Sequence, residues 1–197
     1  MRIGIFGGTF DPPHVGHVLA ATDASEALVL DRLVFIPAAQ QPLKAGVVSA
    51  AAEDRLAMVR LAIGTDPRFT VDSVEIERGG LSYTVDTLRT LRERFRDDRA
   101  LALFLLLGED VVETLPKWRE PGSVASLAEI AILTRVAWGQ ETDAVSPRTN
   151  GPGRVARTRR VDVSSTEIRA RVREGKSLRG FVADAVAEYI AERRLYR

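Results

Sequence analysis

The sequence contains no cysteine, so disulfide bonds and thiolate metal sites are excluded. It has no apolar stretch close to the roughly 20 residues that a membrane helix needs, and its apolar start, Ile3 to Phe6, is too short for a signal peptide. It also lacks a charge excess, since 28 basic residues face 27 acidic ones. A dedicated nucleic-acid binder would carry a clear basic excess. These absences predict a soluble cytoplasmic protein with neither membrane nor nucleic acid among its partners.

What the sequence does contain suits a single folded domain. Its 197 residues, 45% of them hydrophobic, are enough to bury a core. Short apolar runs alternate along the chain with segments of helical spacing, which predicts an α/β fold. We expect a Rossmann-like, doubly wound parallel sheet with helices on both faces. One domain should span residues 1–197, with a flexible loop at 138–153 and a helical portion at 164–197.

The apolar spacing gives the expected elements. Strands are expected at 2–6, 33–36, 69–76, 101–107, 128–133 and 155–163. The run at 101–107 should be a central strand buried on both faces, whereas 69–76 alternates as a half-exposed strand does. A loop is expected at 38–49. Helices are expected at about 17–30, along Leu56, Val59 and Ile63, along Val85 to Phe95, from Ser164, and along an apolar stripe from Phe181 to Ile190.

The end of the first strand is the first candidate site. Ligands of parallel sheets bind beyond the carboxyl ends of the strands, and Gly7 and Gly8 let the backbone approach a ligand closely. The two histidines of the chain, His14 and His17, lie beside the start of the next helix, whose free N–H groups attract anions. They can therefore hold a polyphosphate and the charge that develops on it. A structural role for both histidines, or half of a metal site, is the alternative.

The run from Gly7 to His17 resembles the signature of the nucleotidyltransferases named for their His-x-Gly-His motif, which His14 to His17 supply. The resemblance implies that the two histidines contact the phosphates of ATP. It also implies direct attack by an acceptor phosphate on the α-phosphorus, without a covalent enzyme intermediate. The residues of this run that it assigns to ATP binding are Gly7, Gly8, Thr9, Phe10 and Gly16.

A second candidate phosphate site begins at Ser164. Ser164 and Glu167, three residues apart, form a capping box that fixes the start of a helix, and Arg169 can bind phosphate oxygens from its first turns. Alone, these residues favour a capped helix with a solvated arginine. Beside the first motif they resemble the second signature of the same superfamily, with Val163 in place of its usual isoleucine. The resemblance implies a triphosphate site with a catalytic Arg169, formed by Ser164, Ser165, Thr166 and Arg169.

The middle of the chain points to the acceptor. Ser82 is expected to cap a helix whose first N–H groups, at Tyr83 and Thr84, can bind a carboxylate. A carboxylate near Gly108, at Asp110, can accept hydrogen bonds from ribose hydroxyls. Trp118 offers an aromatic face to a cationic pyridinium ring. Each of these features has an equally good structural explanation: a helix cap, a turn and a half-buried core residue.

In this order the segments resemble the bacterial nicotinate-nucleotide adenylyltransferase family, and the resemblance covers essentially the whole chain. It implies that ATP and nicotinate mononucleotide give deamido-NAD and pyrophosphate in NAD biosynthesis, with Mg²⁺ held mainly by the ATP phosphates and no metal site on the protein. Leu43 departs from the histidine that the family commonly has. Gly108 and Asp110 would then serve ATP, and the acceptor would be bound by Lys44, Ser82, Tyr83, Thr84, Trp118 and Arg135.

Three other functions remain open from the sequence. The same chemistry can act on nicotinamide mononucleotide or phosphopantetheine. A nucleotide-binding regulator without catalysis would carry the same motifs. Nucleic-acid binding would use the arginines at 154, 157, 159 and 160, although a solvated strand face explains them better. The sequence also leaves the oligomeric state open, a homo-oligomer included.

Overall fold

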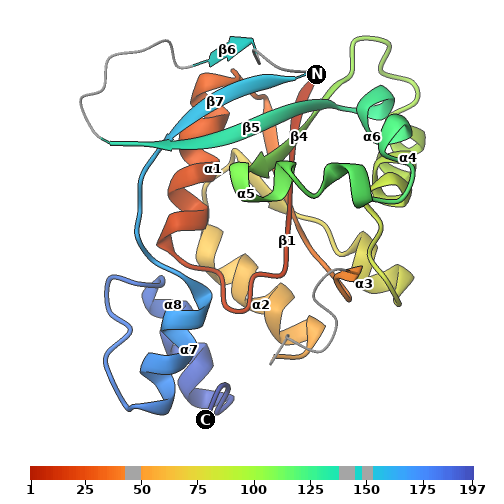
Figure 1. Ribbon diagram of the computed structural model, residues 1–197. Helices are drawn as coiled ribbons and strands as arrows, with labels where there is room; N and C mark the ends of the chain where they lie inside the picture. Colours follow the sequence, from red (N-terminus) through yellow and green to blue (C-terminus); the bar gives the residue numbers. More distant parts are fainter. Residues whose placement is uncertain (43–49, 138–144, 148–152) are drawn as a thin grey trace.

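The computed structural model describes residues 1–42, 50–137, 145–147 and 153–197. At its centre is a seven-stranded sheet in the order β3-β2-β1-β4-β5-β7-β6 (Figure 1). Neighbouring strands pair in parallel, except that β6 pairs antiparallel with β7. The chain moves outward in both directions from β1, so the predicted doubly wound, Rossmann-like sheet is confirmed. The strands are β1 (Arg2–Gly8), β2 (Arg32–Pro37), β3 (Phe69–Val71), β4 (Ala102–Gly108), β5 (Glu129–Val136), β6 (Val145–Pro147) and β7 (Arg154–Arg159).

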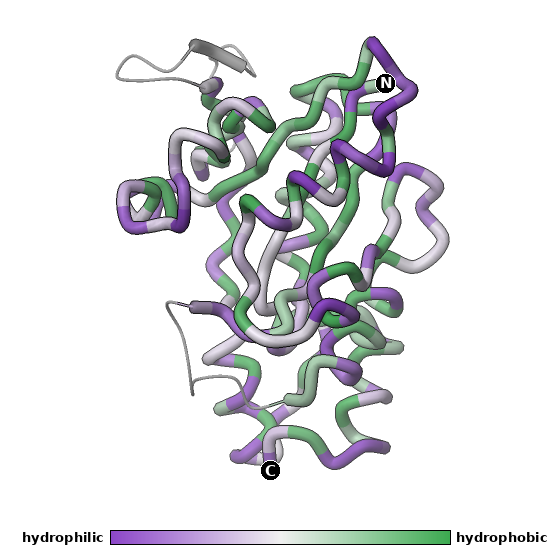
Figure 2. Tube along the Cα trace, turned by 90° about the vertical axis from the view of Figure 1, so that its right-hand side faces the viewer, coloured by the Kyte–Doolittle hydropathy of each residue, from purple (hydrophilic) through white to green (hydrophobic). Residues whose placement is uncertain are grey.

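Strand β4 is buried on both faces, as its unbroken apolar run predicts. Successive side chains of a strand point to opposite faces. Leu103 and Leu105 accordingly belong to the core cluster on one face, and Phe104 and Leu106 belong to the cluster on the other. In Figure 2 the hydrophobic stretches run through the interior of the molecule, and the hydrophilic ones lie mostly at its edges.

Helices cover both faces of the sheet. On one face α4 and α6 contribute buried residues such as Leu88 and Val124, and on the other α1 and α2 contribute Ala24 and Val59. The helices are α1 (Val15–Ala27), α2 (Ala52–Ile63), α3 (Val74–Arg78), α4 (Thr84–Arg94), α5 (Glu109–Val112), α6 (Pro121–Leu127), α7 (Ser165–Arg173) and α8 (Asp184–Glu192), together with the 3₁₀ turn η2 (Leu115–Lys117).

The last two helices lie beyond the carboxyl end of β1 and pack against α2 (Figure 1). A third core cluster joins them, with Met58 from α2, Ile168 from α7 and Val186 from α8 all fully buried. Tyr196, which follows α8, belongs to the same cluster. The C-terminal helices therefore share a core with α2.

The predicted strand at 69–76 is wrong beyond Val71. Strand β3 ends there, and helix α3 begins at Val74. The carboxylate of Asp72 accepts a hydrogen bond from the backbone N–H of Val74 at 2.9 Å, which turns the chain out of the strand. This turn also brings Glu75 into the interior, where it is only 8% exposed.

Other details also differ from the predictions. The strand expected at 155–163 ends at Arg159, and the loop expected at 138–153 contains β6, with its other residues outside the described part up to 152. The buried face of α2 includes Arg55 and Met58, whereas Leu56 and Ile63 are only half-buried. An apolar stripe at helical spacing did not reveal that an arginine would occupy the buried face.

Candidate active site

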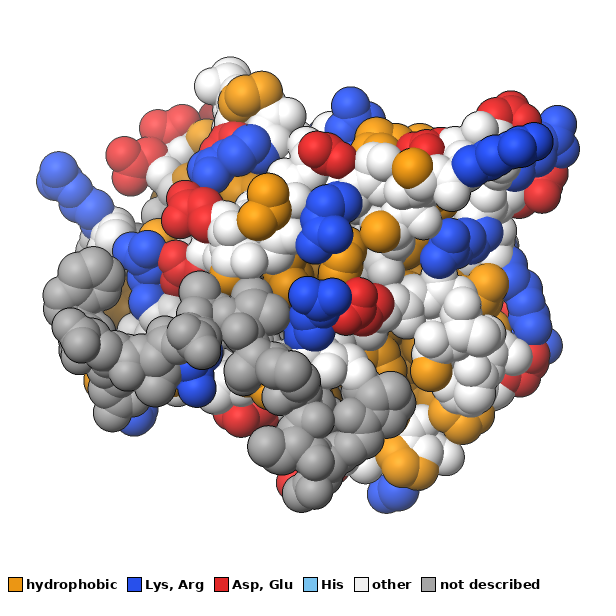
Figure 3. Space-filling model, turned by 90° about the horizontal axis from the view of Figure 1, so that it is seen from above, with side chains coloured by type: hydrophobic (Ala, Val, Ile, Leu, Met, Phe, Trp, Pro, Cys, Tyr) orange, Lys and Arg blue, Asp and Glu red, His pale blue; other side chains and the backbone are white. Residues whose placement is uncertain are grey.

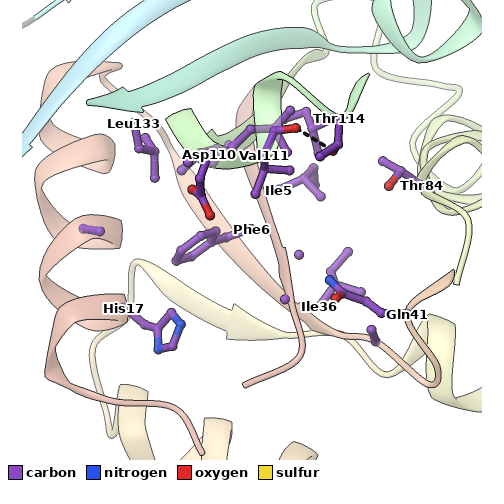
Figure 4. Close-up of a pocket in the computed structure, with 18 of the residues that line it drawn as sticks. Ile5, Phe6, His17, Ile36, Gln41, Thr84, Asp110, Val111, Thr114 and Leu133 are labelled. Atoms are coloured by element: carbon purple, nitrogen blue, oxygen red, sulfur yellow. Dashed lines mark hydrogen bonds between the residues drawn. The ribbon is translucent and has the colours of Figure 1, made fainter. Parts of the chain in front are cut away.

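A cleft of about 630 Å³ opens at the carboxyl ends of β1 and β4, where a doubly wound sheet places its ligands. The volume suits a nucleotide-sized ligand. Figure 4 shows His17 and Asp110 toward one end of this cleft and Thr84 and Gln41 toward the other. We call these the histidine end and the α4 end.

The histidine end is organised by the start of α1. The backbone N–H of His14, the N-cap residue, donates to Nδ1 of His17 at 3.1 Å. The two imidazole centroids lie only 3.7 Å apart. Because Nδ1 of His17 accepts this bond, the neutral ring carries its proton on Nε2, which can donate to a ligand. The predicted pair is therefore preorganised by a backbone hydrogen bond.

Both histidines are uncharged at neutral pH. Burial, and then the positive charge of Arg135, lower the pKa of His14 to about 4. Burial, His14 and Arg135 together lower the pKa of His17 well below its ordinary value. A polyphosphate arriving at these rings would raise both pKa values, because an adjacent anion favours the protonated form. The positive charge of the two histidines therefore depends on the ligand.

The second predicted phosphate segment lies against the first. Ser164 caps α7 by accepting from the N–H of Glu167 at 3.1 Å, which is one of the two hydrogen bonds of the predicted capping box. The Ser165 hydroxyl donates to the carbonyl of Pro12 at 2.8 Å. Arg169 donates to the carbonyl of Asp11 at 2.7 Å. The start of α7 therefore holds the loop between β1 and α1 from behind.

The other predicted nucleotide residues divide into two groups. Gly7, Gly8, Gly16, Ser164 and Ser165 line the cleft with the histidines. Thr9, Phe10, Thr166 and Arg169 lie outside that lining. The Phe10 side chain is 2% exposed and packs against Phe6 and Phe35, so only its backbone can face a ligand. A Cβ at Gly8 would lie 2.8 Å from the Phe10 ring, which explains that glycine by packing.

Asp110 lies over the end of β4. A Cβ at Gly108 would be 2.6 Å from Oδ1 of Asp110, so only glycine allows the carboxylate to fold back over the strand end. Both residues line the cleft. The pair predicted for ribose binding is thus adjacent to the histidine end.

The α4 end presents free backbone donors. Tyr83 is the N-cap of α4 and Thr84 its first residue. Within the part of the chain that the structure describes, neither N–H donates a hydrogen bond. Trp118 lines the same end, with its indole N–H bonded to Thr114 Oγ1 at 2.9 Å. This arrangement leaves two N–H groups and one aromatic side chain available to bind an acceptor substrate.

Ser82 does not cap α4, contrary to the prediction. Its hydroxyl accepts from the N–H of Ala39 at 2.9 Å and so fixes the loop after β2. Ser82 still lines the cleft, as does Arg135 from β5. Lys44, also predicted for the acceptor, lies outside the described residues.

Glu75 is a site residue that the sequence did not reveal. It lines the α4 end, and Oε1 accepts from the Thr87 hydroxyl at 2.7 Å. Burial raises the pKa of its carboxyl, against the opposing effects of Thr87, Ser82 and Arg78. It escaped notice because its segment resembles a strand rather than the helix α3. Other cleft residues that the sequence did not reveal are Gln41, Thr87, Thr114, Lys117 and Arg119.

Arg55 was missed because it lies beneath the cleft. Its side chain is fully buried, at 1% exposure. It donates to the carbonyl of Thr9 at 2.8 Å and to the carbonyl of Ala39 at 3.0 Å. One guanidinium thus joins the loop after β1 to the loop after β2, and burial lowers its pKa.

The arginines considered for nucleic-acid binding are engaged within the protein. Three of them form ion pairs: Arg154 with Glu129, Arg159 with Asp23 and Arg160 with Asp162. Figure 3, a view from above, shows basic and acidic side chains interspersed on that face. In the described ranges, no helix is long and apolar enough to cross a membrane. No group of three His, Cys, Asp or Glu side chains that could hold a metal occurs among the same residues.

Comparison with known proteins gives a consistent result. Residues 5–171 match the family model described as cytidylyltransferase-like. A probable nicotinate-nucleotide adenylyltransferase of Gemmatimonas aurantiaca is 54% identical, over 100% of this chain and 93% of that protein. The protein of the same description from Thermus thermophilus is 44% identical over the full length of both chains.

Solved structures show the same fold. Nicotinic acid mononucleotide adenylyltransferase of Plasmodium falciparum, complexed with NaAD, superposes with a TM-score of 0.76 at 16% identity. That comparison covers 99% of this chain and 97% of the other. A putative nicotinate-nucleotide adenylyltransferase of Vibrio parahaemolyticus gives a TM-score of 0.69 at 17% identity, covering 100% of this chain and 95% of the other.

Proposed function

Since the chain belongs to the cytidylyltransferase-like family and acts as a nicotinate-nucleotide adenylyltransferase in NAD biosynthesis, we propose how its cleft joins ATP to nicotinate mononucleotide, giving deamido-NAD and pyrophosphate. One observation carries the proposal. The cleft places the histidine pair at one end and the free N–H groups of Tyr83 and Thr84 at the other. Two anionic groups can therefore be held in one cavity at the same time.

The histidine end binds the triphosphate. Nε2 of His17 donates to a phosphate oxygen, and His14 gains a proton as the phosphates approach and raise its pKa. Gly7 and Gly16 leave room for the phosphate chain beside these rings. An oxygen of the acceptor phosphate attacks the α-phosphorus, the bond from that phosphorus to the bridging oxygen breaks, and pyrophosphate leaves. Since the attacking phosphate is already ionised, no general base is needed.

Ser164, Ser165 and Arg169 support this end. The serines line the cleft at the start of α7, where free N–H groups favour an anion. Arg169 bonds the carbonyl of Asp11 and lies outside the lining, so we assign it a role in holding the loop, with its charge acting from behind. Asp110 accepts from the ribose hydroxyls of ATP.

The α4 end selects the acceptor. The N–H groups of Tyr83 and Thr84 bind the nicotinate carboxylate, and the helix dipole of α4 favours the negative charge. Trp118 stacks on the pyridinium ring, a cation suited to an aromatic face. Arg135, which lines the cleft and whose charge acts on both histidines, binds the acceptor phosphate. Lys44 keeps its proposed phosphate role, although it lies outside the described residues.

The carboxylates that line the cleft decide how Mg²⁺ would bind there. The acidic lining residues, in the described part of the chain, are Asp110 and Glu75, and Glu75 is already bonded to Thr87. Asp110 is the lining carboxylate that would assist a Mg²⁺ ion bound mainly by the ATP phosphates. Such an ion would neutralise phosphate charge. Nucleic acid has no part in this function, and a cytoplasmic location suits its ATP supply.

Pyrophosphate release tests the acceptor. ATP and Mg²⁺ are held constant while nicotinate mononucleotide, nicotinamide mononucleotide and phosphopantetheine are offered in turn. We expect the acid nucleotide to give the highest kcat/KM, because only it presents a carboxylate to the two N–H groups. Faster turnover of the amide would overturn the acceptor assignment. ATP binding without pyrophosphate from any acceptor would leave the regulator as the function.

A further inference from the structure

The side chain of Asp11 is the centre of a buried network behind the loop of the first motif. It is 4% exposed, and its Oδ1 accepts from the Tyr196 hydroxyl at 2.8 Å and from the Ala50 N–H at 3.1 Å. Its other oxygen lies 3.8 Å from Nη1 of Arg169. Residues from four separate parts of the sequence therefore meet at one carboxylate.

Neither Asp11 nor Tyr196 is among the described residues that line the cleft. Their described hydrogen bonds are connected to the site through the backbone of the loop. Arg169 bonds the carbonyl of Asp11, and Arg55 bonds the carbonyl of Thr9. With both carbonyls held from behind, the loop has little freedom to change the position of His14.

Tyr196 keeps its place at a conformational cost. Its backbone φ is +65°, a region that a bulky side chain rarely adopts. The hydroxyl is buried beside Asp11, and burial and this carboxylate raise the pKa of the phenol far above its ordinary value. The phenol is therefore protonated at neutral pH and donates its hydrogen to the carboxylate. A merely space-filling residue would need neither the hydroxyl nor this backbone conformation.

We infer that Tyr196 is a positioning residue for the reaction: its hydroxyl, through Asp11, fixes the loop from Thr9 to His14 in the shape that binds ATP. This inference rests on the proposed ATP site at the histidine end. Loss of the bond leaves a buried carboxylate with one donor fewer, which favours a rearranged loop. The α4 end, on the far side of the cleft, should be unaffected.

The chain offers a matched control for this bond. Tyr189, in α8, donates its hydroxyl to Asp54 Oδ1, also at 2.8 Å. Both tyrosines belong to the same cluster around α8, but Asp54 lies in α2 and not in the loop of the first motif. Tyr196→Phe and Tyr189→Phe each remove one tyrosine–aspartate hydrogen bond, and only the first changes a bond to that loop.

Steady-state kinetics of the full-length protein with ATP and nicotinate mononucleotide distinguishes the effects of Tyr196→Phe and Tyr189→Phe. We expect Tyr196→Phe to raise KM for ATP about tenfold, the lower range for a hydrogen bond to a charged group. Its KM for nicotinate mononucleotide should stay within about twofold, and Tyr189→Phe should leave both KM values near those of the wild type. Equal ATP KM values in the two variants would overturn the inference. A wild-type enzyme without activity would instead refute the proposed function.

Asp11→Ala supplies a second test, which can also be used if Tyr196→Phe does not fold. The variant removes the group through which Tyr196 acts, so we expect a higher KM for ATP with an unchanged KM for the acceptor. Adding Tyr196→Phe to Asp11→Ala should raise the ATP KM no further. An unchanged ATP KM in Asp11→Ala, or a further rise in the double variant, would contradict the link.

Discussion

The two ends of the cleft are built on different principles. At the histidine end, the His17 ring accepts a hydrogen bond from the His14 backbone, and the loop that carries the two histidines is held from behind by Arg55 and Arg169. At the α4 end, the donors are two backbone N–H groups in the first turn of a helix. One end is a preorganised set of side chains, whereas the other uses helix geometry.

The charges of the two ends differ as well. Burial and Arg135 keep the histidines neutral, so their protonation depends on an incoming phosphate. At the α4 end, burial raises the pKa of the Glu75 carboxyl, against the opposing effects of Thr87, Ser82 and Arg78. Burial thus disfavours the charged form at both ends, a cation at the histidine end and an anion at the α4 end.

The largest effect should come from removing the proton donor of the histidine end. His17→Asn keeps a side-chain acceptor for the N–H of His14 but loses Nε2. We expect kcat to fall about 10²–10³-fold, as when one preorganised donor to a transition-state charge is lost. Pyrophosphate release measures kcat, and urea unfolding should give a free energy within about 1 kcal/mol of the wild type. A kcat within threefold of the wild type would assign His17 a structural role only.

Acid should destabilise the fold through His14. The unfolded chain protonates its histidine near pH 6.5 and the folded one only near pH 4, so the unfolded state binds more protons between these values. Stability is therefore fully present above about pH 6.5 and falls by about 3 kcal/mol by pH 4, from this group alone. The free energy of unfolding in urea, measured for the wild type and His14→Asn at pH 7 and pH 4.5, checks this expected loss of stability. Equal losses in the two proteins would contradict the buried, neutral imidazole.

Substituting proline at Thr84 removes its backbone N–H, so the contribution of that N–H can be distinguished from the contribution of the side chain. Thr84 is the first residue of α4, a position that accepts proline without harm to the helix. Thr84→Pro should raise KM for nicotinate mononucleotide about tenfold, the cost of one charge-assisted hydrogen bond, and leave KM for ATP unchanged. Thr84→Ala keeps the N–H and should resemble the wild type. If both variants show the same acceptor KM, the N–H does not bind the carboxylate.

The histidine end could be predicted from the sequence because its parts are local. Gly7 to His17 form one short run, and the cap at Ser164 depends on Glu167 three residues later. The alternating strands and helices likewise predicted the doubly wound sheet, because each element's periodicity is a local property.

The α4 end and the support behind the loop depend on contacts distant in sequence. Ser82 appeared to be a helix cap because its partner, the N–H of Ala39, is 43 residues away. Arg55 and Tyr196 reach the loop across 46 and 185 residues, respectively. No spacing rule connects such positions, since the fold alone brings them together. Glu75 was hidden for another reason: its alternating neighbours favour a strand, and the hydrogen bond from Val74 to Asp72 replaces it with a helix.

The smallest expected effect is that of Glu75 on the pH dependence of stability. Its sign is opposite to that of His14, because stability falls as the pH rises. The pKa of Glu75 is higher in the folded state than in the unfolded state, where it is about 4.5. Above that pH the folded state therefore binds more protons than the unfolded state, and the contribution of Glu75 to stability declines as the pH rises. Glu75→Gln cannot ionise, so its stability relative to the wild type should increase from pH 4.5 to pH 8. Glu77→Gln, on the exposed side of α3, is the matched substitution for comparison. A pH-independent difference for Glu75→Gln in urea unfolding would mean that this carboxyl ionises as an exposed one does, and the charge contrast between the two ends would be lost.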